Sequence, residues 1–414
     1  MKKTILALLL AAPLFAQAED TFKLPTVTVS GFGTLAATRA NTDDAQFARP
    51  NQASGAGKSF RTGVDSNLGL QGNASINSWL SATMQGLVRK DGADDFGADL
   101  TLAFLKAQVN DNLSIRVGRT ALPAFLISDY RNVGFANHMV RPPAEVYNLM
   151  PLNSIDGVDA TWQQSFKDTT VSAQITVGSS KADISSSGGT LHVKATDIAG
   201  ITLIAEHGPV TARVGRVWGK LTVNDSVAVN TLLNGLRAAG TGYKFASLAP
   251  LADNLALDHK AGVFTSAGLT MDWNNVVVQA EYAKREIPSY LNDSASWSVM
   301  TGYRIGKFLP YFNHAEIKTL GRVANTVPNS CPAGYPAACT PTLGALSTGV
   351  DYMTAPITQS TDTLGVRWDF HKSMALKAQI DRVRPTGNAG LLLRAAPGFT
   401  GPVTVGAIAL DFVF

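Results

Sequence analysis

The feature that most constrains this chain is a period-two alternation of apolar and polar residues, which recurs from about residue 25 to the C-terminus. In the segment Thr169 to Val177, for example, Val171, Ala173, Ile175 and Val177 alternate with polar residues. Successive side chains of a β-strand point to opposite faces, so a strand with one apolar face shows this period. The chain is therefore predicted to be all-β.

Very short connections and much longer ones follow each other in alternation between these segments, as in an antiparallel up-and-down meander. The short ones are predicted at Asn77-Ser78, Asp111-Asn112, Lys167-Asp168, Gly208-Pro209, Asn274-Asn275 and Lys372-Ser373, with a seventh near Lys307–Leu309. The long ones are predicted at 39–60, 90–97, 119–155, 178–189, 224–258, 286–295, 320–357 and 385–400. Together they connect sixteen strands. An 18-stranded arrangement stays open, because 224–258 has room for a hairpin, although Asn230–Leu236 has the pattern of a helical turn.

The tryptophans favour a closed membrane barrel over a soluble sandwich, which would show the same alternation. Four of them, Trp79, Trp162, Trp273 and Trp368, lie close to short turns, and Trp218 and Trp297 lie near the ends of long loops. Two such rings are typical of the two interfaces of a bilayer. Only 16% of the residues are charged, and beyond about residue 20 no apolar run is long enough for a membrane helix. Closure into a barrel would pair every strand edge.

The N-terminus has the pattern of a secretory signal peptide. Lys2 and Lys3 precede the apolar run Ile5–Leu14, and a small-residue cleavage site follows at Ala16–Ala18. We predict a signal peptide over 1–18, cleaved after Ala18, and a single outer-membrane barrel domain over 19–414. Removal of the signal peptide leaves 33 basic and 31 acidic residues, which is a formal charge of +2. The remaining sequence has no basic patch typical of nucleic-acid binding.

The two cysteines, Cys331 and Cys339, lie eight positions apart in a stretch rich in Pro, Gly and Ala. In an exported protein this spacing predicts one loop-closing disulfide. No further ligands lie nearby in the sequence, so neither a metal site nor a cofactor is predicted.

Several segments, taken in order, resemble the strands of general porins from Gram-negative bacteria. Val27–Gly33 resembles a porin first strand, and Asp65–Gly72 followed by Leu80–Gln85 resembles the second and third strands. Leu113–Arg119 is similar to the fifth strand, whose Gly-Arg pair leads into a long third loop. The final segment Ile408–Phe414 resembles the sorting strand of outer-membrane barrels, with Leu410, Phe412 and Phe414 on its lipid face.

The resemblance implies a transmembrane antiparallel β-barrel of about 16 strands, located in the bacterial outer membrane and assembled as a homotrimer. It implies that the third loop folds into the lumen and that the outer-membrane assembly machinery recognises the C-terminal strand. The chain departs from the family in its third loop, Ala121 to Asp156, which lacks an acidic run, and in the disulfide of the seventh loop.

A barrel of this size leaves a water-filled lumen, which predicts passive diffusion of ions and small hydrophilic solutes. The third loop is expected to form the constriction with Arg119, Asp129, Tyr130, Arg131, His138, Arg141, Glu145 and Tyr147. Charged strand residues are expected to face the lumen rather than lipid: Arg89, Arg116, Lys194, Arg213, Arg304, Arg367, Lys377, Asp65, Asp159, Glu281, Asp369 and Asp381. Because arginines outnumber acids in the third loop, we predict a weak preference for anions.

Three other functions stay open at this point. Aromatic residues of the third loop, such as Phe125, Phe135 and Tyr147, suit a channel specific for phosphate, a sugar or an organic acid. An enzymatic barrel would need a catalytic constellation, and no nucleophile-elbow spacing occurs. The segment Gly55–Ser59 imitates the end of a phosphate loop, but Gln52 stands where the first glycine is required. An adhesin is the third alternative.

Overall fold

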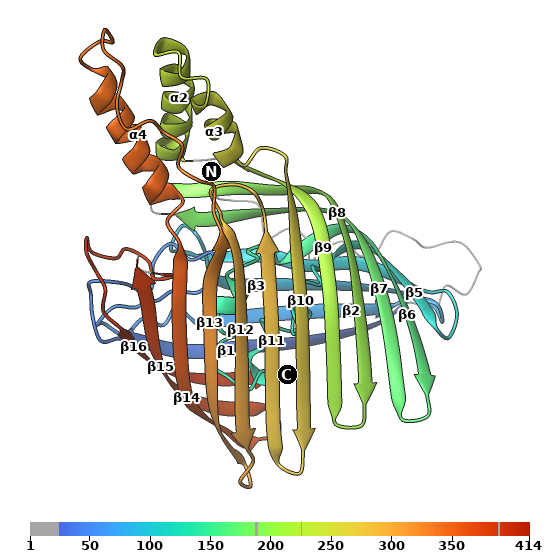
Figure 1. The fold of residues 1–414 in the computed structure, drawn as a ribbon. Coiled ribbons are helices and arrows are strands. Elements are labelled where there is room, and N and C mark those ends of the chain that lie inside the picture. Colours follow the sequence, from blue (N-terminus) through green and yellow to red (C-terminus); the bar gives the residue numbers. More distant parts are fainter. Residues whose placement is uncertain (1–24, 187–188, 225, 388–389) are drawn as a thin grey trace, which may run out of the picture.

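The computed structural model describes residues 25–186, 189–224, 226–387 and 390–414, so the predicted signal peptide lies outside the described residues. Sixteen antiparallel strands form one closed barrel in which each strand pairs with its neighbours in sequence and β1 pairs with β16 (Figure 1). The predicted fold class and strand number are therefore confirmed. The strands are β1 (Thr26–Ala40), β2 (Asn67–Ser75), β3 (Leu80–Lys90), β4 (Phe96–Gln108), β5 (Leu113–Ala121), β6 (Ser154–Phe166), β7 (Thr169–Ser186), β8 (Gly189–His207), β9 (Val210–Asn224), β10 (Lys260–Trp273), β11 (Val276–Glu286), β12 (Asp293–Tyr303), β13 (Phe308–Gly321), β14 (Ile357–His371), β15 (Met374–Gly387) and β16 (Val403–Val413).

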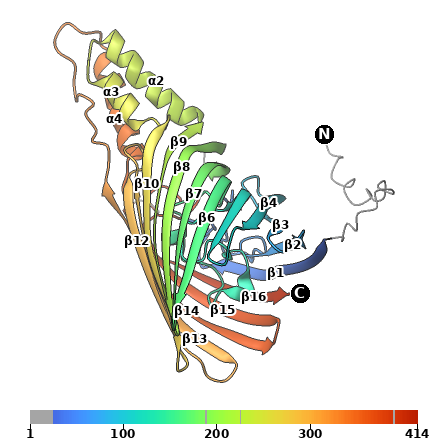
Figure 2. The same ribbon diagram turned by 90° about the vertical axis from the view of Figure 1, so that its right-hand side faces the viewer.

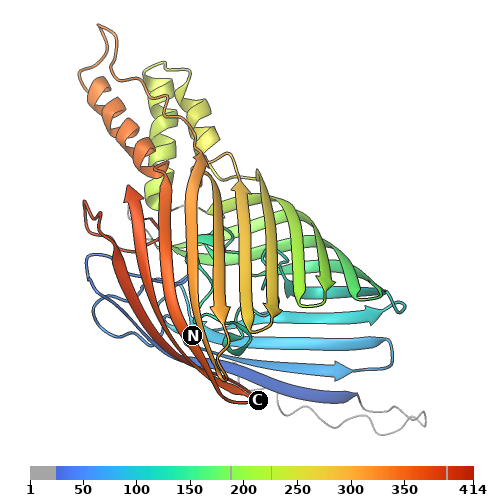
Figure 3. The same ribbon diagram turned by 60° about the horizontal axis from the view of Figure 1, so that its bottom comes forward.

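Short turns lie at one end of the barrel and long loops at the other, as Figure 3 shows for the central strands. Asn274 and Asn275 both have positive φ, 47° and 70°, which is the conformation of a type I′ hairpin turn. The seventh predicted turn lies slightly earlier than expected, between Tyr303 and Phe308, because Leu309 already belongs to β13. The turn chemistry of the sequence thus fixes the pairing of neighbouring strands.

Four helices and one short 3-10 helix lie in the long loops: η1 (Gly134–Ala136), α1 (Ala144–Tyr147), α2 (Val227–Gly242), α3 (Leu248–Leu255) and α4 (Cys339–Met353). The predicted helical turn at Asn230–Leu236 lies within α2, so the long loop before β10 holds helices rather than two further strands. Helices α2, α3 and α4 pack together above the taller side of the barrel (Figure 2). The predicted disulfide between Cys331 and Cys339 forms at the start of α4.

The outer surface of the barrel is apolar, as lipid requires. All six tryptophans are exposed on it, each by between 39% and 58%, rather than buried in a core. Within the described ranges, no helix is both long and apolar enough to cross a bilayer.

Two irregularities in the strands change which side chains face inward. Thr101 of β4 is inserted opposite the Gln85/Gly86 step of β3, within the segment 100–108 where the apolar pattern changes parity. A second irregularity lies in the β7–β8 hairpin, where Asp197 has a φ of 52° and the register shifts against both neighbouring strands. This hairpin was predicted to open into a loop over 178–189, but its strands continue to Ser186 and Gly189. The prediction is wrong because the bulge lets the ladder continue.

Candidate pore constriction

The third loop, residues 122–153 between β5 and β6, folds into the barrel and is fastened to the opposite wall. Arg367 of β14 donates to the backbone carbonyls of Phe135 and Asn137 at 2.7 and 2.8 Å. Lys377 of β15 donates to the carbonyls of Gly134 and Met139 and forms an ion pair with Asp411 at 2.8 Å. These two wall cations therefore serve as anchors for loop carbonyls that strands and helices leave unsatisfied.

The acidic and phenolic groups of the loop also bind the wall. Glu145 of α1 accepts hydrogen bonds from Gln359 and Thr361 of β14. Burial raises the pKa of Glu145 above its ordinary value, although these hydrogen bonds oppose the shift. The hydroxyl of Tyr147 donates to Glu281 of β11 at 2.7 Å. Neither loop side chain faces open solvent, so their contribution is to position the loop.

Arg141 is the most extensively paired residue of the loop. Its guanidinium lies 2.7 Å from Asp65 and 2.6 Å from Asp381, and all three side chains are at most 4% exposed. Burial alone would lower the pKa of Arg141, but the two carboxylates raise it above its ordinary value. The predicted role of Arg141 as a free positive charge of the constriction is wrong, because two carboxylates neutralise it.

A second group of arginines lacks such pairing. Arg49 of the first loop, Arg89 of β3 and Arg131 of the third loop line one cavity beside Arg141. Within the described residues, no carboxylate lies within salt-bridge distance of Arg49 or Arg131, and Arg89 has only Asp99 at 3.8 Å. Burial, together with the like charges of Arg89 and Arg49, lowers the pKa of Arg131 to about 9. Arg131 therefore keeps its charge at neutral pH.

A polar cavity of about 570 Å³ continues from this cluster along β3, β4 and the third loop. Asp99, Asp129, Lys181 and Asp183 line it, together with Arg119. Arg119 was assigned to the third loop, but it lies in β5 and makes a two-fold ion pair with Asp156 at 2.6 and 2.8 Å. Most of the residues that line this cavity are polar or charged.

The remaining predicted wall residues are placed as follows. Arg116 pairs with Asp159 at 2.9 Å, Arg213 donates to the carbonyl of Pro123, and Asp369 accepts from Arg367. Arg304 lies in the turn after β12, at the turn end of the barrel, where it pairs with Asp272. Most of these charged groups therefore contact one another or the loop, and fewer of them are free charges than the arginine count of the sequence assumed.

The prediction that Lys194 faces the lumen is wrong. It is exposed on the outside of β8, while its neighbours Val193 and Ala195 are buried inside, at 4% and 5% exposure. The bulge at Asp197 causes this inversion, since one extra residue puts the side chains on its two sides out of phase, so that residues 193–195 face opposite to the alternation set by the rest of β8. This part of the β7–β8 hairpin lies near the loop end of the barrel, where a lysine side chain that points outward is solvated.

His138 and Tyr130 differ in their surroundings. The Nδ1 atom of His138 is buried and has no hydrogen-bond partner within the described part of the chain. Burial, and next the positive charge of Arg367, lower the pKa of His138 to about 4. Tyr130 is 39% exposed and Asp129 faces the polar cavity.

Sequence reasoning missed Arg49, because a residue 18 positions before the start of β2 at Asn67 gave no sign that the first loop also enters the barrel. One signal was available. Phe47 and Ala48 are apolar residues directly before Arg49, and both are buried, with the centre of the Phe47 ring 4.7 Å from the guanidinium carbon of Arg141. Among the described residues, no group of three or more His, Cys, Asp or Glu side chains is arranged to hold a metal ion.

A family model described as Gram-negative porin matches residues 5–313. Among solved structures, the trimer form of OmpT, an outer membrane protein of Vibrio cholerae, aligns with a TM-score of 0.53 and 13% identity, over 95% of this chain and 100% of that chain. OmpF of Salmonella typhi, solved in complex with daunomycin, aligns with a TM-score of 0.55 and 14% identity, over 94% and 97%. At such identities the structural likeness establishes the fold alone. No curated protein sequence matches the chain significantly.

Proposed function

Because this chain belongs to the Gram-negative porin family, we propose that it forms a water-filled channel for passive diffusion of ions and small hydrophilic solutes across the outer membrane, with a weak preference for anions. The closed barrel with its polar internal cavity supports a diffusion path. The proposal involves no chemical step, since transfer follows from the concentration gradient alone.

The anion preference is supported by one observation: Arg49, Arg89 and Arg131 line the same cavity beside the third loop. Arg141 is matched by two carboxylates and Arg119 by one, whereas among the described residues Arg49 and Arg131 have no carboxylate within salt-bridge distance and Arg89 has only Asp99, at 3.8 Å. Fixed cations in a narrow, low-dielectric passage raise the local concentration of anions. The proposed sign is the one expected from the sequence, and Arg131 supports both, but Arg49 and Arg89 take the place of Arg119 and Arg141.

Reversal potentials across planar bilayers test this proposal. Under a KCl gradient we expect the purified protein to prefer chloride, and Arg131→Gln and Arg89→Gln to reduce that preference. Arg216→Gln is the matched control, because Arg216 is exposed on the outer face of β9. Cation selectivity of the unmodified protein would contradict the anion preference, and absence of conductance would contradict the channel itself.

We propose further that three copies assemble through the outer face of β1 to β5. A shallow hollow on this face is lined by small residues, including Gly72, Ala74, Ala82 and Ala103. Small side chains let two walls approach closely, so Ala82→Trp is expected to dissociate trimers in native electrophoresis. Ala212→Trp, on the exposed face of β9, is the control that should leave the assembly intact.

Export and assembly complete the proposal. Cleavage after Ala18 predicts that sequencing of the mature N-terminus begins at Glu19. At the other end of the chain, Phe414 is 67% exposed, and its ring stacks beside that of Phe412 with centroids 6.3 Å apart. An exposed terminal aromatic residue suits recognition by the outer-membrane assembly machinery. Deletion of Phe414 is expected to lower the amount of folded protein in the outer membrane, measured in membrane fractions.

A further inference from the structure

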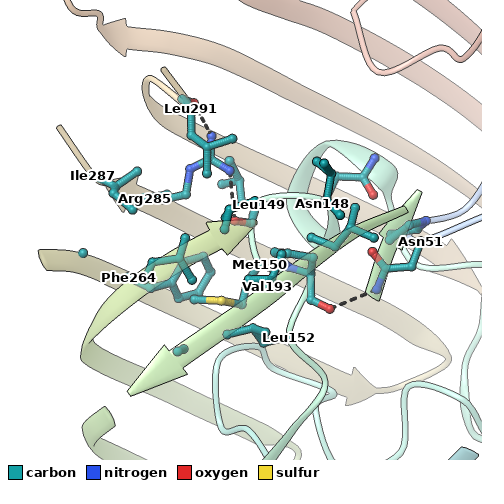
Figure 4. Close-up of a pocket in the computed structure, with 18 of the residues that line it drawn as sticks. Asn51, Asn148, Leu149, Met150, Leu152, Val193, Phe264, Arg285, Ile287 and Leu291 are labelled. Atoms are coloured by element: carbon teal, nitrogen blue, oxygen red, sulfur yellow. Dashed lines mark hydrogen bonds between the residues drawn. The ribbon is translucent and has the colours of Figure 1, made fainter. Parts of the chain in front are cut away.

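A second large internal cavity, of about 460 Å³, lies against β8, β9, β10 and β11 and is mainly apolar (Figure 4). Leu149, Met150 and Leu152 of the third loop face it from one side. Val193 and Phe264 face it from the barrel wall, and both are at most 4% exposed. Its volume lies within the range of small-molecule binding sites.

An apolar wall is unexpected at this place, because the interior of a channel barrel is ordinarily polar. The bulge at Asp197 is its cause, since it turns Val193 and Ala195 from the outer face of β8 to the inner one. Ile198 and Val217 continue the same surface and are also buried. The cavity is therefore built by the strand geometry, and a diffusion path for hydrophilic solutes does not need it.

Three cations border this apolar space, namely Arg49, Lys220, which pairs with Asp197 at 2.8 Å, and Arg285 of β11. The two terminal nitrogens of Arg285 donate to the carbonyls of Leu149, Leu291 and Asn292, at 3.3, 2.6 and 3.3 Å. Its Nε atom is buried without a hydrogen-bond partner, and no carboxylate of the described chain lies within salt-bridge distance of the guanidinium. The buried Oδ1 of Asn148, also on the cavity wall, is unpaired too.

Asp293 attracts this guanidinium electrostatically, but its carboxylate accepts from the Ile287 backbone N–H at 2.7 Å and lies beyond salt-bridge distance of Arg285. A buried guanidinium whose hydrogen bonds all go to carbonyl groups therefore keeps a positive charge that is only partly compensated. A carboxylate would compensate that charge and accept the hydrogen bond from Nε. The surrounding leucine, valine and phenylalanine side chains would simultaneously take an apolar body out of water. Charge and apolarity together therefore select one class of ligand.

We propose that this cavity is a binding site for amphiphilic monocarboxylates, in which Arg285 holds the carboxylate and the apolar body lies between the third loop and β8 to β10. The inference rests on the proposed channel function and names a solute class for it. Arg49 and Asn51 line both this cavity and the neighbouring arginine-lined cavity. An anion drawn to the arginine cluster thus reaches the apolar site without leaving the barrel.

The test is concentration-dependent block of the ion current through the purified protein in planar bilayers by acetate, butanoate, hexanoate and octanoate. We expect the dissociation constant to fall by up to about fourfold per methylene, as apolar burial predicts. Hexanol, which is neutral, and hexylamine, which is a cation at neutral pH, match hexanoate in length but lack its negative charge, and both are expected to bind at least tenfold more weakly. A channel that conducts chloride but shows no dependence on chain length would overturn this inference and leave the channel function intact. Absence of conductance would instead refute the channel function.

Substitutions test separately how the charge of Arg285 and the apolar wall contribute to binding. Arg285→Gln is expected to weaken hexanoate binding at least tenfold, while Arg285→Lys, which keeps the charge, restores most of it. Val193→Thr keeps the size of the side chain but adds a hydroxyl, and is expected to reduce the gain per methylene. The neighbouring Lys194→Gln and the outer-face Arg216→Gln are the matched controls and should bind hexanoate unchanged. Equal binding of hexanoate by Arg285→Gln and the unmodified protein would contradict the assigned role of Arg285.

Discussion

Replacement of Arg141 by glutamine tests how the third loop is held in the barrel. The change removes hydrogen bonds of 2.9 and 2.7 Å to Asp65 and of 2.6 Å to Asp381, and leaves both carboxylates buried. Removing one partner of a buried ion pair costs about 3–5 kcal/mol, mainly because the remaining charge is uncompensated. Because two carboxylates lose their partner here, we expect a loss of unfolding free energy at the upper end of that range at pH 7.

The loss is expected to depend on pH. Burial alone would raise the pKa of Asp65, but Arg141 holds it below its ordinary value. A depressed folded-state pKa stabilises the unmodified protein above the unfolded pKa of about 3.9, and this contribution is lost as the pH falls through the folded pKa. In Arg141→Gln the pKa of Asp65 rises instead, because burial is no longer opposed. Protonation then relieves the variant, so the difference in unfolding free energy should shrink between pH 7 and pH 4.

Equilibrium unfolding by urea in phospholipid vesicles, at pH 7 and pH 4, measures this difference, and reversal potentials measure its consequence for ion preference. Two uncompensated carboxylates beside the arginine cluster should shift the preference toward cations at pH 7. The triple variant Arg141→Met, Asp65→Asn, Asp381→Asn removes all three charges and should recover most of the stability. Equal stability of Arg141→Gln and the unmodified protein at pH 7 would refute the reasoning.

Three further changes test other parts of the barrel. At the seam between β1 and β16, a Cβ atom on Gly33 would lie 2.5 Å from the Phe412 ring, so Gly33→Ala is expected to cost about 1–3 kcal/mol in urea unfolding, partly relieved by Phe412→Leu. His138, with a folded pKa of about 4, should reduce stability as the pH falls from about 6.5 to 4, and His138→Gln should remove that slope in the same titrations. The double change of Cys331 and Cys339 to serine should destabilise the α4 region by about 2–3 kcal/mol, seen as faster local proteolysis, while single-channel conductance stays unchanged. The disulfide argument would be contradicted if the double cysteine variant were cleaved at the same rate as the unmodified protein. The argument for His138 fails if His138→Gln keeps the pH dependence of stability, and the argument for Gly33 fails if Gly33→Ala leaves the unfolding free energy unchanged.

Strand number, strand order and most turns were predictable because they depend on local signals. Two-residue turns such as Asn274-Asn275 restrict backbone angles within the turn itself, and alternation over about ten residues shows which face is apolar. The outward positions of the tryptophans followed from the same alternation, because a membrane barrel reverses the usual placement of apolar side chains.

The pairing of charges inside the lumen was not predictable, because it depends on contacts between residues far apart in sequence. Arg141 meets Asp381 across 240 positions, and Arg367 meets the carbonyl of Phe135 across 232. A charge count along the third loop treats each arginine as independent. In the folded chain the charge of Arg141 is matched by two carboxylates, and Arg49, from a loop that the count omitted, lines the arginine cavity with no carboxylate within salt-bridge distance among the described residues.

The bulge at Asp197 links the error over Lys194 to the apolar cavity. If β8 were regular, Lys194 would face inward and Val193 would face outward, as the alternation of the sequence predicts. The positive φ of Asp197 and the shifted register reverse both, so the same residues that seemed to belong to a lipid-facing strand become the wall of an internal site. Asp197→Val, in which a β-branched side chain disfavours the positive φ of the bulge, should favour regular alternation, bring Lys194 into the cavity and abolish chain-length-dependent block by carboxylates. Because Asp197 itself lies outside the cavity lining, an unchanged block in that variant would show that the bulge is not what builds the site.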